Sequence, residues 1–163
     1  MLILYTIFNV ILILVIIILA VIVLSGIVIF IQNRKPHLVF GLVNGKLREI
    51  PDKKNAVSTD TAYMDKLVSP MPFKETLEDT KSALKKALEM YGGIEIVKEE
   101  ENYIYAIATT PTMRFHDDME IYFDKAGRII HFRSASRAGY SDMGLNRQRY
   151  DKIVESYEHE EHK

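Results

Sequence analysis

An uncharged apolar segment at the start of the chain constrains the fold more than any other feature. Residues 1–32 contain no Lys, Arg, Asp, Glu or His, and all 21 basic and 22 acidic residues of the 163-residue chain follow them. An α-helix rises about 1.5 Å per residue, so roughly 20 apolar residues cross the hydrocarbon core of a bilayer. The apolar run from Leu2 to Ile31 exceeds that length. The sequence therefore predicts a transmembrane anchor over residues 1–32.

A cleaved signal peptide is the alternative interpretation of this segment. Such a peptide needs a basic start, an apolar stretch of about 7–15 residues and a cleavage site with small residues. No basic side chain precedes the apolar run, and Phe30-Ile31-Gln32-Asn33 offers no such cleavage site. The sequence therefore favours a retained single-pass anchor in the cell membrane, with the lipid bilayer as the first partner of the chain.

The charges that follow the anchor indicate its orientation. Residues 33–54 hold six basic and two acidic residues and form a basic juxtamembrane arm. Lys and Arg next to a transmembrane helix are enriched on the cytoplasmic side. We therefore expect the N-terminus outside and the soluble domain in the cytoplasm.

Residues 55–163 are predicted to form one soluble α+β domain, preceded by extended chain and loop over 36–73. Apolar residues recur at helical spacing after Lys74, then at alternate positions, then at helical spacing again. The expected elements are a helix over 74–90, strands over 93–98, 103–110, 113–123 and 128–137, and a helix over 146–157. Short connections between consecutive strands favour an antiparallel four-stranded meander flanked by two helices, in the order α-β-β-β-β-α.

The register of the last hairpin can be predicted from its side chains. Pairing Phe123 with Arg128 leaves a turn in which Gly127 is expected at positive φ. This register gives an apolar face, with Ile121 opposite Ile130 and Met119 opposite Phe132. It also gives a charged outer face, with Asp118 opposite Arg133 and Glu120 opposite His131.

Signatures of known chemistry are missing from the sequence. The chain has no Cys, which excludes disulfides and thiol nucleophiles, and it lacks the common nucleotide-binding, hydrolase and metalloprotease motifs. We therefore expect no cofactor and no metal. His116-Asp117-Asp118 resembles a ligand set, but adjacent strand residues face opposite ways, so surface charge on a hairpin is the preferred interpretation. His159 and His162 are interpreted as part of a solvated, fraying tail.

Two segments resemble the landmarks of a known family. Residues 133–147 read R-S-A-S-R-A-G-Y-S-D-M-G-L-N-R, and residues 51–59 read P-D-K-K-N-A-V-S-T. These segments resemble the bacterial and plastid family called domain of unknown function 1499, whose upstream landmark is usually P-N-C-V-S-S. Ala56 replaces the usual Cys and Lys54 the usual Pro, which removes any thiol-dependent role. The resemblance covers most of residues 40–157 and implies a membrane-anchored member, without supplying an activity.

The charge order of the final helix suggests an anion site. A helix N-terminus carries a partial positive charge, yet with Asn146 as N-cap this helix opens with Arg147 and Arg149. Residues 125–149 hold six basic residues and one acidic residue. Free N–H groups, guanidinium groups and hydroxyls together suit a phosphate or carboxylate. The hypothetical anion-binding residues are Arg133, Ser134, Ser136, Arg137, Ser141, Asn146 and Arg147.

A structural role for the same residues is the alternative. Asp142 would then pair with one of the arginines, and Arg147 with Asp151 four residues later. The strand arginines would pair with the carboxylates of the neighbouring strand, namely Asp117, Asp118 and Glu120.

Two classes of function are consistent with these patterns. The first is a non-enzymatic binding domain at the membrane surface, whose partner is a protein, an anionic small molecule or a lipid headgroup. The second is an anchored hydrolase or transferase that uses Ser136 or Ser141 with Asp142 and a histidine, and His116 is the one suitably placed. The predicted register points His116 away from Ser134 and Ser136, which favours the binding domain. A net charge of −1 and a short basic patch argue against nucleic acid.

The predicted orientation can be tested with a topology reporter. Because the basic flank follows the helix, a reporter fused after Lys163 should report the cytoplasm. A signal from the opposite side of the membrane would contradict the predicted orientation and leave the anchor itself intact.

Overall fold

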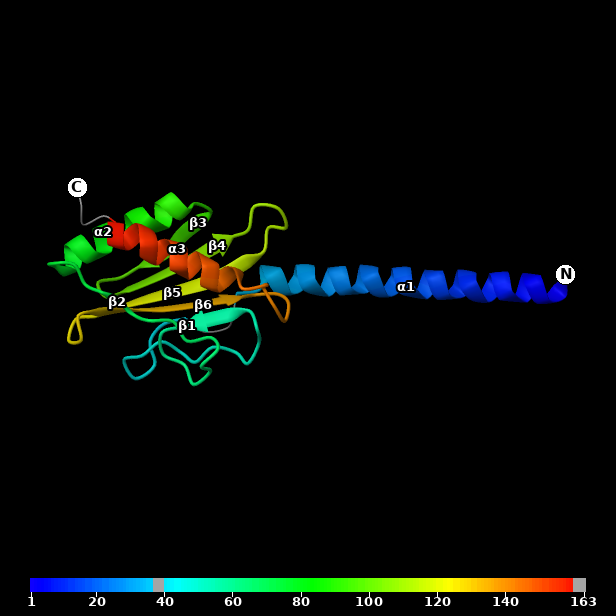
Figure 1. Cartoon of the computed structure of the whole chain (residues 1–163), viewed down its shortest axis with the longest axis horizontal. Coiled ribbons are helices and arrows are strands. Elements are labelled where there is room, and N and C mark those ends of the chain that lie inside the picture. The colour runs from blue at the N-terminus through cyan, green and yellow to red at the C-terminus, as the bar shows by residue number, and fades with distance from the viewer. Residues whose placement is uncertain (37–39, 160–163) are drawn as a thin grey trace.

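A computed structural model describes residues 1–36 and 40–159. It shows a long N-terminal helix, α1 (Leu2–Arg34), that extends away from a small domain (Figure 1). None of the α1 residues is buried against the domain. This helix is long and apolar enough to cross a membrane. Of the tail predicted to fray, His159 is the last residue of α3, and His162 lies outside the described residues.

The domain is an α+β structure built on one antiparallel sheet. Its elements are β1 (Ala56–Ser58), β2 (Met71–Pro72), α2 (Leu77–Tyr91), β3 (Ile94–Glu99), β4 (Tyr103–Thr109), β5 (His116–Asp124), β6 (Ile129–Ser136) and α3 (Leu145–His159). The strand order is β1-β6-β5-β4-β3, and β2 also pairs with β6. The α+β class is thus confirmed.

The prediction of only four strands is wrong. The sheet has six strands, because two short pieces of the segment expected to be loop pair with the outer edge of β6. Val57 is paired with Ser134, and Met71 with Ile130. Pairing satisfies the backbone groups of that edge, which would otherwise be a template for aggregation.

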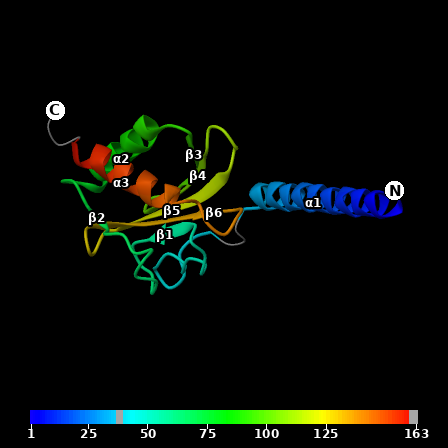
Figure 2. The same ribbon diagram turned by 45° about the vertical axis from the view of Figure 1, so that its right-hand side comes forward.

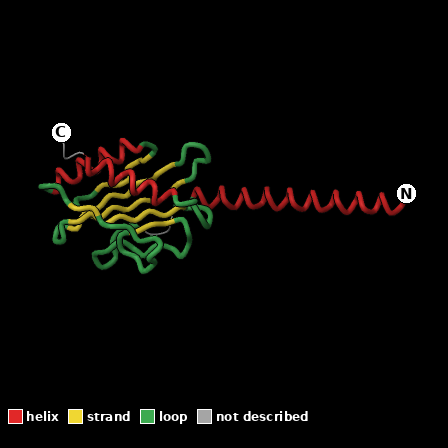
Figure 3. The backbone as a smooth tube through the Cα atoms, viewed as in Figure 1, coloured by secondary structure: helices red, strands yellow, loops and turns green. Residues whose placement is uncertain are grey.

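Both α2 and α3 cover the same face of the sheet (Figures 1 and 2). The main core lies between them and the sheet, and its fully buried residues include Leu84 of α2, Ile153 of α3 and Phe132 of β6. A tube view shows the two helices in one layer above the strands and the loops that precede β2 below them (Figure 3).

The register predicted for the last hairpin is wrong by two residues. Ile121 pairs with Phe132, and Glu120 pairs with Arg133. Side chains alternate between faces with a period of two, so this shift leaves every residue on its predicted face.

The turn explains the shift. Asp124 pairs with Ile129, and the residue at positive φ is Arg128 (+52°), not Gly127. The Asp124 carboxylate accepts hydrogen bonds from the N–H groups of Ala126 and Gly127, and a Cβ atom on Gly127 would lie 2.7 Å from its Oδ2. Glycine is therefore needed here for the close approach of a carboxylate.

The charged face of the hairpin is buried, which corrects the prediction of an outer face. Part of the arm lies against this side of the sheet, where Leu47 packs with Tyr103 and Tyr105 in a second apolar cluster. The ring of Phe40 stacks on Tyr105, with their centroids 4.0 Å apart. The arm therefore acts as a cover for the lower face of the sheet.

The start of α2 is set by its cap. The expected helix began at Lys74, but the structure begins it at Leu77, because Thr76 is the N-cap and its Oγ1 accepts from Asp79 N at 3.1 Å. The acidic residues Glu78 and Asp79 lie in the first turn, where their negative charges interact favourably with the positive end of the helix dipole.

We expect Thr76→Ala to lower the free energy of unfolding by about 1 kcal/mol, since it removes the cap acceptor. Thr76→Ser is the matched control, because it retains a hydroxyl and should leave stability close to that of the parent. Chemical denaturation followed by circular dichroism measures both. If both variants lose the same free energy of unfolding, the hydroxyl of the N-cap residue contributes nothing to stability.

Candidate functional site

Three carboxylates on β5, one on the α3 face of the sheet and two on the opposite face, are each buried against an arginine. Asp117 lies on the α3 side, where its Oδ2 accepts from Arg149 Nη2 at 2.5 Å. On the opposite side Asp118 accepts from Arg137 at 2.7 Å, and Glu120 from Arg133 at 2.8 Å. The interpretation of His116-Asp117-Asp118 as surface charge is therefore wrong for both aspartates. Buried carboxylates require such partners, because an unpaired buried charge is costly.

Two tyrosines complete the carboxylate sites on the arm side. Tyr103 donates its hydroxyl to Glu120 at 2.6 Å, and Tyr105 donates to Asp118 at 2.7 Å. Burial and the neighbouring carboxylate both raise the pKa of each phenol well above its ordinary value. Both tyrosines therefore stay protonated and act as donors at physiological pH.

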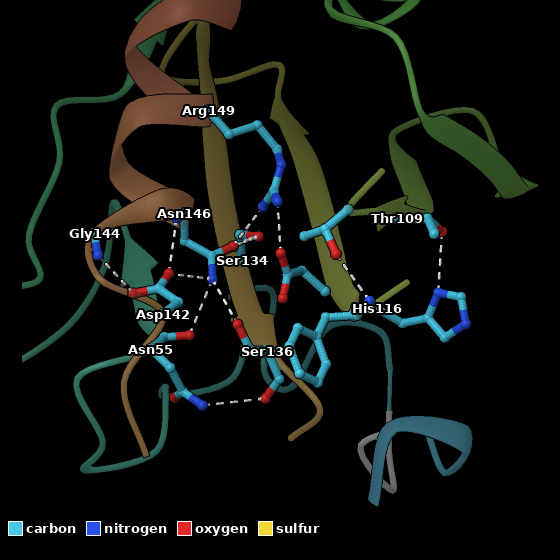
Figure 4. Close-up of polar contacts among 12 residues, drawn as sticks. Asn55, Thr109, His116, Ser134, Ser136, Asp142, Gly144, Asn146 and Arg149 are labelled. Atoms are coloured by element: carbon cyan, nitrogen blue, oxygen red, sulfur yellow. Dashed lines mark hydrogen bonds and ion pairs between the residues drawn. The ribbon is translucent and has the colours of Figure 1, made fainter. Parts of the chain in front are cut away.

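The side chain of Asn146, at the start of α3, connects the two family landmarks (Figure 4). Its Oδ1 accepts from Ser134 Oγ at 2.5 Å and from Arg149 Nη1 at 2.7 Å. Its Nδ2 donates to Ser136 Oγ and to the Asn55 carbonyl, each at 3.0 Å. The residue is 1 % exposed, so this amide holds Asn55 (just before β1), β6 and α3 together in the interior.

Asn146 is not the N-cap of α3, which corrects the expected helix start at this residue. The carboxylate of Asp142, ahead of the helix, accepts from Asn146 N at 2.8 Å and from Gly144 N at 3.0 Å. A negative charge therefore does face the helix N-terminus. Arg147 and Arg149 still open the helix, but the carboxylate of this loop residue offsets their unfavourable position at its N-terminus.

The seven residues of the hypothetical anion site do not converge on one open surface. Ser134, Ser136 and Asn146 bond to one another on the α3 side, whereas Arg133 and Arg137 pair with carboxylates on the arm side. The remaining two point elsewhere: Arg147 donates to the carbonyls of Asp65 and Leu67, and Ser141 Oγ accepts from Met143 N. The pairing of strand arginines with strand carboxylates is as the structural alternative predicts, while anion binding by these residues stays a prediction.

The geometry around His116 bears on the enzymatic alternative. Its Nδ1 lies 3.0 Å from Thr109 Oγ1, and burial together with the nearby charges of Arg137 and Arg114 lowers its pKa. The imidazole belongs to the face of Asp118, whereas Ser134 and Ser136 belong to the face of α3. The histidine and these serines are therefore separated by the sheet.

A cleft of about 810 Å³ opens on the α3 side, between the end of α2, the β4–β5 loop and α3. Its lining combines apolar groups with three cations, and the residues are Met90, Tyr91, Gly92, Gly93, Ala108, Thr109, Thr110, Pro111, Arg114, Leu145, Arg149, Lys152, Glu155 and Ser156. Arg149 is 2 % exposed, and within residues 1–36 and 40–159 its buried Nε–H has no hydrogen-bond acceptor. In that same part of the chain no three His, Asp or Glu side chains gather in a metal-binding arrangement.

The end of α1 is joined to the loop that borders this cleft. Asn33 Nδ2 donates to the Arg114 carbonyl at 2.8 Å, and Asn33 Oδ1 accepts from His116 N at 2.7 Å. One amide therefore makes a hydrogen bond to the backbone of the β4–β5 loop and another to the first residue of β5. This joint places the cleft beside the end of the apolar helix.

These features describe a small α+β domain carried on an apolar N-terminal helix. Residues 46–156 match the family of proteins of unknown function DUF1499, and the chain belongs to that family. The match includes both landmark segments, residues 51–59 and 133–147, which are in contact through the hydrogen bond between Asn146 and the Asn55 carbonyl. No curated protein matches the chain.

Several residues that line the cleft or join it to α1 cannot be singled out from the sequence. In the sequence Arg149 adds to the basic charge of the final helix, and its spacing from Asn146 and Ile153, which places all three on one helix face, is the signal that it is buried. Arg114 and Lys152 gave no signal, because each stands alone in a polar stretch. Asn33 followed the anchor, and nothing in the sequence indicated which loop it would meet.

We expect Arg137→Ala to destabilise the domain by roughly 3–5 kcal/mol, because it removes the buried guanidinium that pairs with Asp118. Arg147→Ala should lower stability by less, because the hydrogen bonds described for the Arg147 side chain go only to backbone carbonyls. The double replacement Asp118→Leu with Arg137→Met should recover much of the loss. Thermal melting measures all three. An unchanged melting temperature for Arg137→Ala would instead favour a binding role for this arginine.

Proposed function

We propose that this chain is a single-pass membrane protein whose cytoplasmic domain binds an anionic amphiphile in the cleft between α2, α3 and the β4–β5 loop. The domain acts as a binding module and not as a catalyst. The observation that carries the proposal is the position of the cleft: a concave, partly apolar space bordered by cations lies beside the end of an apolar helix.

The charges in the cleft favour an anion. Arg114 and Lys152 are exposed at its border, and Glu155 is the acidic residue among those that line it. Asp117 neutralises Arg149, whose Nε–H is buried and has no acceptor among the described residues, so the exposed Arg114 and Lys152 carry the attraction for an anion. A phosphate or carboxylate group bound here gains charge-assisted hydrogen bonds, which are stronger than neutral ones.

The apolar lining favours a ligand that also has a hydrophobic part. Tyr91, Ala108 and Leu145 line the cleft, and Tyr91 lies 5.9 Å from the Arg149 guanidinium carbon. Ligand sites in proteins typically enclose about 300–1,000 Å³, and this cleft falls within that range. A lipid headgroup with part of its glycerol backbone, or a free acyl carboxylate, fits this combination of groups.

The membrane supplies such ligands at high local concentration. The Asn33 hydrogen bonds hold the β4–β5 loop against the end of α1, so the cleft opens next to the lipid surface. The cytoplasmic leaflet carries most anionic lipids, and the basic arm favours the same side. A domain fixed in this place needs no long-range diffusion to find its ligand.

A charge-reversal variant tests this proposal. The full chain in phosphatidylcholine nanodiscs is titrated with dihexanoyl phosphatidic acid, and binding is measured by calorimetry. Lys152→Glu should weaken binding about tenfold or more, equivalent to about 1.4 kcal/mol, because it places a second negative charge at the border. The effect should shrink at high salt, since the border residues are exposed.

Lys125→Glu is the matched control. It makes the same charge change in the β5–β6 turn, at the end of the domain opposite α1 (Figure 1), where Lys125 pairs with Glu101 on the surface. Equal affinity of the Lys152→Glu variant and the parent would contradict the proposal. Equal affinity for dihexanoyl phosphatidylcholine would contradict its anionic specificity.

A further inference from the structure

Two loops at the α1 end of the domain carry exposed apolar side chains. The β4–β5 loop contains Met113, and the β6–α3 loop contains Tyr140 and Met143. These three residues, here called the tip residues, are 67 %, 64 % and 95 % exposed. Both loops lie at the end of the sheet from which α1 extends, as three views show (Figures 1, 2 and 3). We propose that the tip residues form a second membrane contact, which inserts into the headgroup region of the leaflet that α1 leaves.

The joint at Asn33 sets the depth of the β4–β5 loop. Asn33 lies two residues beyond Ile31, the last residue of the apolar run, so it sits about 3 Å farther along the helix axis. The carbonyl of Arg114 is 2.8 Å from the Asn33 amide nitrogen. With Ile31 at the edge of the hydrocarbon core, Arg114 and its neighbour Met113 must lie within the interfacial layer.

The conformation of the loops is consistent with a defined position of the tip residues. Met143 has a backbone φ of +56° and Arg114 one of +55°, values that residues other than glycine rarely adopt. Ser141 Oγ accepts from Met143 N at 3.2 Å, which holds the turn in shape. The loop thus presents a large apolar side chain from an ordered turn.

The chemistry of the tip residues matches a lipid surface. Tyrosine concentrates at membrane interfaces, where its ring meets acyl chains and its hydroxyl meets headgroups. Methionine is flexible and apolar and adapts to an irregular surface. Arg34, Lys35 and Arg114 are exposed at the same end and suit anionic headgroups.

Continuity with α1 identifies the bilayer as the occupant of this surface. A partner protein or a second copy would have to reach loops that already lie beside the emerging helix. The lipid around that helix contacts these loops without the binding of a further molecule. The tip residues and α1 then fix the domain at two separate places, and the cleft between α2, α3 and the β4–β5 loop keeps one orientation toward the leaflet.

This inference rests on the proposed membrane insertion of α1, and site-directed spin labelling tests the two separately. The chain contains no Cys, so each single-Cys variant carries one nitroxide. We choose Met113→Cys and Met143→Cys at the tips, Ile16→Cys within α1, and Met64→Cys in the loop before β2. Met64 is a matched control because it is also an exposed methionine, at 77 %, but lies in the segment below the sheet.

The full chain is placed in nanodiscs containing phosphatidylcholine and phosphatidylglycerol, and collision rates with oxygen and with a water-soluble nickel chelate are measured. The oxygen-to-nickel ratio should be highest at position 16, intermediate at 113 and 143, and lowest at 64. If position 16 has the high ratio expected in lipid but position 113 or 143 has the same ratio as position 64, the tip contact is overturned and membrane insertion of α1 is not. A low ratio at position 16 would overturn both.

Discussion

The side-chain amide of Asn146 is the interaction on which the rest of the domain depends. It bonds to Ser134 and Ser136 of β6, to the backbone of Asn55 and to Arg149 of α3. A buried amide contributes stability only when its donors and acceptors are all used, because each unsatisfied group costs about 1–3 kcal/mol. The amide therefore specifies one relative placement of sheet, helix and preceding segment. This role explains why the family landmarks contain these polar residues without requiring that they bind a ligand.

The carboxylates of β5 organise both faces of the sheet by the same physical rule. Successive residues point in opposite directions, so Asp117 pairs with Arg149 beneath α3 while Asp118 and Glu120 pair with arginines beneath the arm. Burial of each carboxylate demands an arginine, and these pairs use most of the positive charge that the sequence places near the C-terminal motif. The exposed cations Arg114 and Lys152 lie instead at the border of the cleft, outside the motif.

The position of the apolar helix α1 places the cleft and the loop tips at one end of the domain. Two hydrogen bonds from Asn33 tie the end of α1 to the β4–β5 loop. That loop borders the cleft through Arg114 and carries Met113 at its tip. The proposed amphiphile site and the proposed headgroup contact therefore lie at the same end of the domain. We infer a module that samples the surface of the membrane in which it is anchored.

The sequence alone determined the features that depend on periodicity and local chemistry. It indicated the apolar helix, the α+β class and the assignment of residues to sheet faces, because side-chain alternation survives even a register error of two. It did not determine the pairing of Asp124 with Ile129, since the turn depends on how a carboxylate meets Gly127. Only tertiary structure brought Asn55 to Asn146, buried the charged face and joined Asn33 to the β4–β5 loop. The hydrogen bonds of Asn33 to Arg114 and of Asn146 to Asn55 link residues 81 and 91 positions apart, and no local pattern records which distant partner will satisfy a buried polar group.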